Sequence, residues 1–259
     1  MLDRRALVRR PSSRLAEGLV THIEREPVDV DLAMRQWEGY VAALREAGWE
    51  TIEVSPVDEC PDSVFVEDTV VMYGDRAVVT RPGADERKPE TAPVADLLDV
   101  LGYDVVSIET PGTLDGGDVL KHGGTVWVGT GGRTNRSGVD QLTAHLAPYG
   151  VRVVAVPVSK VLHLKSAVTA LPDGTVVGYP PLVDDPTVWS SFLAVPEESG
   201  SHVVLLGGDT VLMSSDAPAS KALFEERGWD VVAVDISEFI KLEGCVTCLS
   251  VRLRRSPAR

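Results

Sequence analysis

The feature that most constrains the fold is a short turn pattern that recurs along the chain. Runs of β-branched residues are interrupted four times by glycine-containing turns, at Gly74, Gly123-Gly124, Gly174 and Gly207-Gly208. Glycine supplies the positive φ angles that tight β-hairpins require. The sequence therefore predicts four hairpins spread over most of its length.

A second unit alternates with the hairpins: a helix that ends at glycine and leads into a strand. The helix-ending glycines are Gly48, Gly102, Gly150 and Gly228. Glycine is the preferred residue just after a helix, and the β-branched run behind each one predicts a buried strand. Hairpin, helix and strand recur about every fifty residues, so a chain of 259 residues accommodates roughly five ββαβ units.

We expect these units to form a closed α/β assembly whose loops surround a central axis, a natural place for a site. A doubly wound sheet is the alternative, but the hairpins argue against it. No low-complexity linker or change of composition divides the sequence. It therefore predicts a single domain over residues 1–259, with a first strand at residues 6–8.

The charge balance excludes several kinds of partner. The chain has 25 Lys and Arg against 39 Asp and Glu, a net charge of −14. Binding of nucleic acid requires clustered cationic side chains, and anionic membranes repel an acidic protein. The N-terminal segment lacks the apolar core of a signal peptide, and no stretch is apolar over the ~20 residues of a membrane span. Three cysteines are too few for a disulfide framework, so we expect a cytoplasmic protein.

The most unusual segment is residues 61–69, which carries three carboxylates: Asp62, Glu67 and Asp68. The segment enters an apolar strand, and alternation along a strand predicts that Glu67 and Asp68 point to opposite sides, with one of them inward. A buried carboxylate requires a partner, because an isolated buried charge is very unfavourable. With no metal-ligating histidine nearby, the segment indicates either a solvated strand end or a site for a cationic ligand.

Two further segments place a polar residue beside glycines or apolar side chains. Asp115 precedes Gly116-Gly117, which forms either a simple turn or a loop that lets backbone and ligand approach closely. His163 lies between two leucines, an arrangement more often found for a core histidine than for a functional one. Neither segment is decisive alone.

The C-terminal region contains a C-x-x-C pair, Cys245 and Cys248, in what the pattern predicts to be a terminal β-strand. A structural zinc site needs four ligands, and Cys60 lacks a partner motif. A thioredoxin-like redox pair lies where a strand enters a helix, which is not expected here. The remaining alternatives are inert buried thiols or one nucleophile, for which a cysteine, a histidine and an orienting carboxylate form the minimal set.

Taken together, these segments are far more specific than any one of them. Six motifs occur in a single order: PDSVFVEDT (61–69), TRPGA (80–84), LDGGD (114–118), GGRTN (131–135), LHLKS (162–166) and TCLS (247–250). In this order the chain resembles the dimethylarginine dimethylaminohydrolases of the guanidine-modifying, or amidinotransferase, superfamily, from residue 14 to residue 253. The resemblance implies a five-bladed α/β propeller, which agrees with the count of repeats.

The resemblance also implies a role for each matching residue. Cys248 matches the nucleophile, His163 the general acid and base, and Asp115 the carboxylate that orients the histidine. The residues that match substrate contacts are Asp68 for the guanidinium with Glu67 and Asp62 as further acids, Arg81 and Arg133 for the α-carboxylate, and Leu19 and Leu242 for backbone contacts.

The implied reaction is hydrolysis of methylated arginine to citrulline and methylamine or dimethylamine. Cys248 attacks the guanidinium carbon, His163 protonates the leaving amine, and water releases citrulline from an S-alkylthiouronium intermediate. The resemblance implies no metal and no other cofactor, and the partner is a small-molecule substrate. We expect residues 14–27 to close over that substrate as a lid, and an edge strand could support a homodimer.

Two alternatives stay open. An arginine deiminase or an amidinotransferase shares the first half of the reaction, although such enzymes are usually larger. A non-catalytic protein that binds small cations would use the same acidic pocket without needing Cys248 for turnover.

Overall fold

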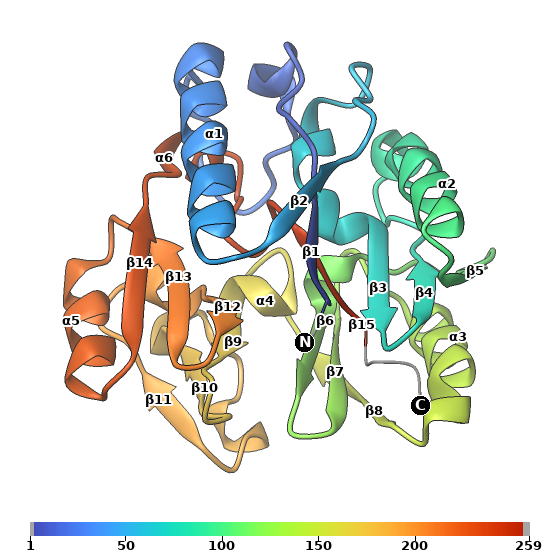
Figure 1. Ribbon diagram of the computed structural model, residues 1–259. Coiled ribbons are helices and arrows are strands. Elements are labelled where there is room, and N and C mark those ends of the chain that lie inside the picture. The colour runs from blue at the N-terminus through green and yellow to red at the C-terminus, as the bar shows by residue number, and fades with distance from the viewer. Residues whose placement is uncertain (1–2, 256–259) are drawn as a thin grey trace.

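The computed structural model describes residues 3–255, which form five three-stranded sheets around the middle of the molecule (Figure 1). The strands of the successive sheets are β1 (Asp3–Val8), β2 (Glu50–Glu53) and β15 (Val251–Arg255); β3 (Val70–Tyr73), β4 (Arg76–Val79) and β5 (Asp104–Ser107); β6 (Val119–His122), β7 (Thr125–Thr130) and β8 (Arg152–Pro157); β9 (Val168–Ala170), β10 (Val176–Gly178) and β11 (Phe192–Ala194); β12 (Val204–Gly207), β13 (Thr210–Ser214) and β14 (Asp230–Val234). The predicted five-bladed α/β propeller is confirmed.

Every blade has the same pairing order. Its middle strand pairs antiparallel with one neighbour and parallel with the other. A parallel neighbour needs a crossover, and four blades provide it as a peripheral α-helix: α1 (Val30–Glu46), α2 (Ala92–Val100), α3 (Arg136–Leu146) and α5 (Pro218–Glu226). The short helices α4 (Leu164–Ala167) and α6 (Ser237–Ile240) connect blades instead. Over residues 3–255, no helix combines the length and apolar character needed to cross a membrane.

The fourth blade departs from the predicted ββαβ repeat. Two 3-10 turns, Pro180–Leu182 and Pro186–Val188, replace the α-helix in the described segment between β10 and β11. Proline lacks the backbone N–H that a helix interior requires, and three prolines fall in this segment. The prediction of a helix in every unit is therefore wrong for this blade.

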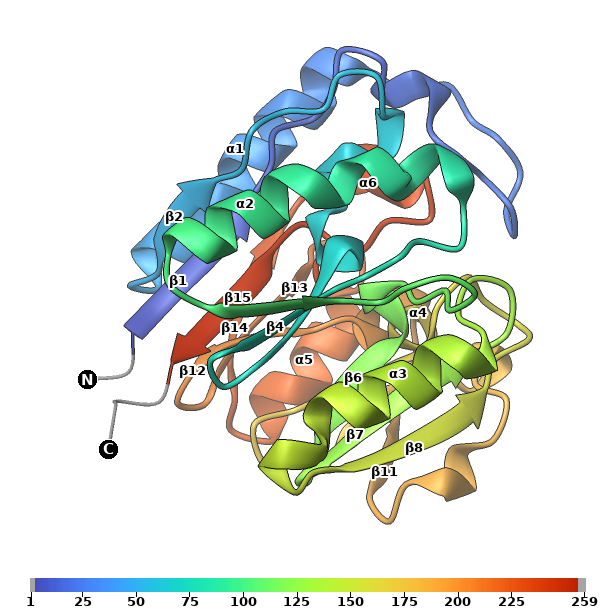
Figure 2. The same cartoon turned by 90° about the vertical axis from the view of Figure 1, so that its right-hand side faces the viewer.

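The chain closes the ring by returning its last strand to the first blade. β15 pairs antiparallel with β1 (Figure 2). In this register Val251 lies opposite Leu7 and Leu253 opposite Arg5. The first blade thus contains the two ends of the described chain. This pairing anchors the C-x-x-C segment just before β15.

Burial follows the position of a strand within its blade. The inner strands β3, β6, β9, β12 and β15 line a central cavity of about 320 Å³, and apolar side chains pack into five clusters. The outer strands β2, β5, β8 and β14 are mostly half-buried or exposed. The prediction that these four strands are buried is wrong. Each lies at the outer edge of its sheet and pairs with a neighbouring strand on one side only, although a helix contacts it. A single domain over residues 1–259 stays a prediction, and residues 1–2 and 256–259 lie outside the described residues.

The end of α1 shows how glycine sets these boundaries. Gly48 has a φ of 82°, and its N–H bonds to the carbonyl of Arg45 at 2.9 Å while that of Trp49 bonds to Leu44 at 3.0 Å. This is the Schellman pattern of a helix end. Positive φ angles also occur at the other predicted helix ends, Gly102, Gly150 and Gly228.

Replacing Gly48 by alanine is expected to lower the free energy of unfolding by about 1 kcal/mol, because a side chain at positive φ is strained. Gly39 lies within α1 with open space where a β-carbon would stand. Gly39→Ala is therefore a matched control, expected to raise the free energy of unfolding by about 0.5–1 kcal/mol. Urea denaturation measures both. Equal effects at the two positions would contradict this account of the helix end.

Candidate active site

Most of the predicted site residues meet in one small cavity of about 20 Å³. The loop before α1, the chain before β3, the loop before α3, the segment entering α4 and the turn before β15 all contribute to it. From the predicted set it is lined by Leu19, Asp62, Asp68, Arg133, His163, Leu242 and Cys248, and in addition by Phe65, Arg87, Leu162, Glu243 and Gly244.

The ring of His163 lies between two carboxylates. Its Nε2 donates to Asp115 Oδ2 at 3.0 Å, and its Nδ1 is 3.9 Å from Asp68 Oδ1. Asp115 is fully buried, and its other oxygen accepts a hydrogen bond from the N–H of Gly83 at 2.8 Å. The glycine of the TRPGA motif thus fixes the carboxylate that in turn fixes the histidine.

Asp68 is held by two donors of its own. Its Oδ2 accepts from Arg87 Nη1 at 2.6 Å, and its Oδ1 accepts from the N–H of Gly117 at 2.8 Å. A β-carbon at Gly117 would lie 2.6 Å from His163 Nδ1 and 2.7 Å from Asp68 Oδ1. The second glycine of LDGGD is therefore required because any side chain there would displace both groups.

These contacts set the protonation of the cluster. Burial by itself lowers the pKa of His163, but the charge of Asp68 and the hydrogen bond to Asp115 outweigh it and raise that pKa to about 9. Burial likewise raises the pKa of Asp68, but the cations of His163 and Arg87 outweigh it and lower that pKa to about 2. At neutral pH the site therefore holds a protonated histidine beside an ionised aspartate.

Two further buried residues, Asp118 and Thr134, help to position His163, and the sequence did not predict either role. Asp118 accepts hydrogen bonds from Thr134 Oγ1 at 2.6 Å and from the N–H of Leu164 at 2.9 Å. Leu164 is the first residue of α4, so Asp118 fixes the backbone directly after His163. Burial raises the pKa of Asp118 to about 6. The signal was present, since Asp118 and Thr134 belong to the LDGGD and GGRTN motifs.

Arg87 was also missed. Its guanidinium is buried and donates to both oxygens of Glu90, at 3.0 and 2.8 Å, as well as to Asp68. The surrounding segment, residues 85–90, is highly charged and predicts a solvated surface, so no pattern pointed to burial. Arg81, which the sequence predicts here, is absent from the described lining of the cavity, and its Nη1 donates to the carbonyl of Gly112 at 3.1 Å.

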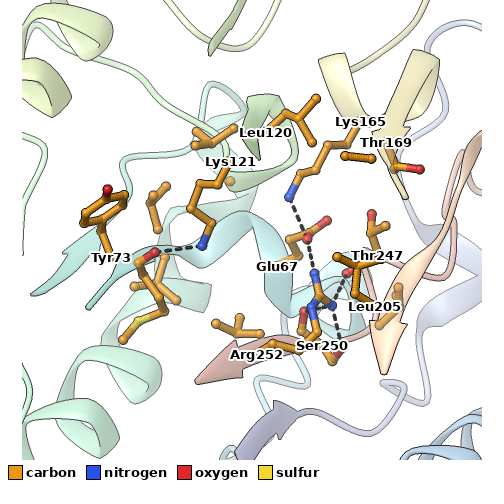
Figure 3. Close-up of a pocket in the computed structure, with 18 of the residues that line it drawn as sticks. Glu67, Tyr73, Leu120, Lys121, Lys165, Thr169, Leu205, Thr247, Ser250 and Arg252 are labelled. Carbon is orange, nitrogen blue, oxygen red and sulfur yellow. Dashed lines mark hydrogen bonds and ion pairs between the residues drawn. The ribbon is translucent and has the colours of Figure 1, made fainter. Parts of the chain in front are cut away.

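Glu67 faces a different cavity from Asp68. Both are buried in a 3-10 helix, Val66–Thr69, rather than at the start of a strand. Figure 3 shows the Glu67 carboxylate in the central cavity beside Lys165 and Arg252. Its Oε1 lies 2.6 Å from Lys165 Nζ and 3.1 Å from Arg252 Nη2. The two carboxylates line different cavities, as expected for opposite sides, and the structure buries both of them rather than one. Glu67 is therefore not part of the described lining of the cavity that holds Cys248, although its charge acts on that thiol.

Cys248 lies in a tight turn and not in the predicted terminal strand. Its N–H bonds to the carbonyl of Cys245 at 3.1 Å, and its carbonyl accepts from the N–H of Glu67 at 3.1 Å. Because the turn uses these backbone groups, the strand begins only at Val251. Cys248 as a residue is 7% exposed, and it lines the cavity.

The loop of residues 14–27 is fastened over the cavity by two carboxylates. The N–H of Leu19 donates to Asp62 at 2.9 Å, and the N–H of Thr21 donates to Glu243 at 2.6 Å. A volume of about 20 Å³ holds about one water molecule. The cavity is therefore too small for a ligand the size of arginine, whose binding requires movement of its walls.

Asp68, Asp115 and His163 offer ligand atoms within 4.8 Å of one another, close enough to hold a metal ion. The chemistry of these donors does not favour a metal, because a ligating histidine must be neutral. His163 stays protonated up to a pH of about 9. The protonated ring and the Arg87 guanidinium instead compensate the two carboxylates.

The fold and this cavity together define a class. A cysteine, a histidine and an anchored carboxylate in one cavity of a five-bladed α/β propeller are the arrangement expected of the guanidine-modifying superfamily.

Comparisons with known proteins identify the family within this class. No protein-family model matches the chain. A curated dimethylarginine dimethylaminohydrolase of Streptomyces coelicolor is 63% identical over 254 residues, which is 98% of either chain. The solved enzyme of Pseudomonas aeruginosa, a cysteine-to-serine mutant complexed with citrulline, is 30% identical with a TM-score of 0.91 and covers 98% of this chain and 100% of its own. A crystal structure of a histidine-to-glycine variant of dimethylarginine dimethylaminohydrolase, an adduct with S-methyl-L-thiocitrulline, is 29% identical with the same TM-score and coverage. The chain belongs to the dimethylarginine dimethylaminohydrolase family.

The ring of His163 is expected to titrate with a midpoint near pH 9, because two carboxylates favour its charged form. Replacing one of them, in Asp115→Asn, is expected to move the midpoint to lower pH. Histidine ring signals in NMR spectra measure this, with the signal assigned by its loss in His163→Gln. A wild-type midpoint at or below the ordinary value of ~6.5 would contradict the assignment.

Proposed function

We propose that this protein hydrolyses Nω-methylated or dimethylated L-arginine to L-citrulline and methylamine or dimethylamine. The observation that carries the proposal is the single cavity lined by the Cys248 thiol, the His163 ring and the Asp68 carboxylate. A guanidinium carbon is a poor electrophile, and this set of groups is suited to bind the cation, attack it and protonate the leaving amine. The names of the related proteins and the citrulline in one of their structures support the same substrate class.

Asp68 is the proposed partner of the substrate guanidinium. Its carboxylate is ionised beside Arg87 and His163, and carboxylate–guanidinium pairs form strong, planar hydrogen bonds. Asp62 is a further acid in the same cavity. Glu67 is engaged by cations of the central cavity, so the proposal gives it no direct contact.

Arg133 is the proposed partner of the substrate α-carboxylate. Its Nη1 is buried without a hydrogen-bond partner among the described residues, and a guanidinium matches a carboxylate in geometry. Leu19 and Leu242 line the same cavity, where their backbone groups are proposed to contact the rest of the amino-acid moiety. A contribution of Arg81 would require rearrangement of its loop, so the proposal rests on Arg133.

The first step forms a bond between the sulfur of Cys248 and the guanidinium carbon. His163, protonated below a pH of about 9, transfers a proton to the methylated nitrogen. The carbon–nitrogen bond then breaks and the amine leaves. An S-alkylthiouronium group remains on Cys248.

The second step uses the neutral histidine left by the first. His163 accepts a proton from a water molecule, whose oxygen attacks the thiouronium carbon. The carbon–sulfur bond breaks, citrulline is released, and the remaining proton of the attacking water passes to the sulfur, which restores the protonated His163 and the Cys248 thiol. The hydrogen bond to Asp115 orients the ring in both steps.

Activation of the thiol is proposed to depend on the substrate. In the ligand-free site, the hydrogen bond with Cys245, burial and the charges of Glu67 and Asp68 raise the pKa of Cys248 well above its ordinary value. A guanidinium bound to Asp68 offsets those charges and favours the thiolate. Attack is thereby coupled to binding of a cation.

Separate incubations with asymmetric dimethylarginine and with arginine test the proposed reaction, with citrulline and the released amine as readouts. Equal amounts of citrulline and dimethylamine from dimethylarginine are expected. Citrulline from arginine alone would indicate a deiminase instead. Product from neither compound would favour a protein that binds small cations without turnover.

Cys248→Ser is expected to lower the rate of citrulline formation by at least about 10³-fold, because a serine hydroxyl is not ionised at neutral pH. Cys245→Ser is the matched control in the same turn and is expected to retain turnover within the same order of magnitude. Citrulline assays with dimethylarginine compare the two. Loss of turnover in Cys245→Ser alone would move the nucleophile to Cys245.

We further propose that residues 14–27 act as a lid that closes over bound ligand and excludes water. Glu243→Gln weakens the charged hydrogen bond to Thr21 and is expected to speed amide hydrogen exchange of the loop at least about tenfold. Glu17→Gln is the control, because Glu17 forms an exposed ion pair with Arg14. Loop exchange that responds neither to Glu243→Gln nor to added citrulline would contradict a lid.

Location and assembly complete the proposal. Free thiols at all three cysteines fit a reducing compartment, and we infer a cytoplasmic protein. The outer strands β2, β5, β8, β11 and β14 each have one edge unpaired among the described strands. Pairing of two such edges is the proposed route to a homodimer.

A further inference from the structure

The second thiol of the C-x-x-C turn has no part in the proposed reaction, yet it lies against the first. The sulfurs of Cys245 and Cys248 are 3.2 Å apart. Both belong to one turn, closed by the hydrogen bond from the N–H of Cys248 to the carbonyl of Cys245. Cys60, the third thiol, instead donates to the carbonyl of Glu86. The close pair is therefore specific to the turn that carries the proposed nucleophile.

The two sulfurs line different cavities. Cys248 lines the small cavity of the site, whereas Cys245 lines a neighbouring cavity of about 500 Å³ that also includes His202. Glu243 and Gly244 line both cavities, so this short segment separates them. The pair of sulfurs therefore borders a second, larger cavity in addition to the site.

We propose that Cys245 and Cys248 form a reversible disulfide when a peroxide oxidises the pair, and that this bond switches the site off. A disulfide needs the sulfurs about 1 Å closer than they are now. Because β15 begins only at Val251, no strand pairing between residues 245 and 248 has to break. The loss of activity rests on the proposed role of Cys248, but formation of the bond does not.

The chemistry balances with one peroxide molecule. The hydrogen bond between the sulfurs lowers the pKa of Cys245 and raises that of Cys248, so the first thiolate forms at Cys245. That thiolate attacks a peroxide oxygen and the oxygen–oxygen bond breaks. Hydroxide departs, and a sulfenic acid remains on Cys245. The sulfur of Cys248 then attacks the Cys245 sulfur, the sulfur–oxygen bond breaks, and water departs with the thiol proton. Two sulfurs lose one electron each, and the peroxide gains two.

The disulfide would also protect the nucleophile. A lone thiol oxidises further to sulfinic and sulfonic acids, which dithiols do not reduce. A neighbouring thiol intercepts the sulfenic acid first. We therefore expect the wild-type protein to recover after oxidation and a protein without Cys245 not to recover.

Intact mass of the reduced full-length protein after treatment with a small molar excess of hydrogen peroxide, enough to oxidise a lone thiol beyond the sulfenic acid, tests the proposal. The expected result is loss of two hydrogen atoms, reversed by dithiothreitol together with the rate of citrulline formation. Cys60→Ser is the control and is expected to behave like the wild type. Cys245→Ser is expected to gain oxygen atoms and to stay inactive after dithiothreitol. Recovery of Cys245→Ser equal to that of the wild type would overturn the proposal.

Peptide mapping decides the question without any variant. Cleavage after Lys241 and Arg252 places both cysteines in one tryptic peptide, residues 242–252. The oxidised wild type is expected to yield this peptide two hydrogens lighter and resistant to alkylation until it is reduced. A peptide that carries added oxygen and no internal disulfide would overturn the proposal, whether or not the protein makes citrulline.

Discussion

The structure depends on the mutual compensation of charges that are fully buried. Arg87, Asp68, His163 and Asp115 form a continuous series of ion pairs and hydrogen bonds. Removal of one member leaves its neighbour as an uncompensated buried charge, at a cost of about 3–5 kcal/mol. The pKa of His163 is raised to about 9, above the ~6.5 of an unfolded histidine. Its contribution to stability is therefore complete below pH ~6.5 and is lost as the pH rises through about 9.

The need to compensate buried charges also explains why the site lies where segments from several blades meet. Two consecutive residues serve different cavities. Glu67 pairs with cations of the central cavity, whereas Asp68 faces the site. The backbone of Glu67 also donates to the carbonyl of Cys248. A single 3-10 turn thus supports the central cavity on one side and the reactive turn on the other. The propeller supplies a frame in which both sets of charges are matched.

Much of the fold and of the site could be predicted from the sequence, because glycines at turns and residues in short motifs have well-defined local roles. Turn and helix-end glycines have few structural alternatives, so the hairpins and the number of blades followed from their spacing. Motif residues such as Cys248 and His163 were identified because several motifs occur in one order. The burial of Arg87 could not be predicted, since it lies in a charged segment and only one of its two carboxylate partners, Glu90, is near in sequence, while Asp68 is 19 residues away. The turn at Cys245 was mistaken for a strand because its apolar residues have the composition of one, and only the tertiary structure distinguishes them.

The central claim is that Cys248 attacks a guanidinium-type carbon and that His163 activates water in the second step. S-methyl-L-thiocitrulline loses methanethiol, a leaving group that needs less help from an acid than an amine does. In His163→Gly it should therefore form the thiouronium, which then persists because no base activates water. Intact mass followed by fragmentation of peptide 242–252 is predicted to locate a stable adduct on Cys248. An adduct on Cys245, or an unmodified protein that still binds the compound, would contradict the account.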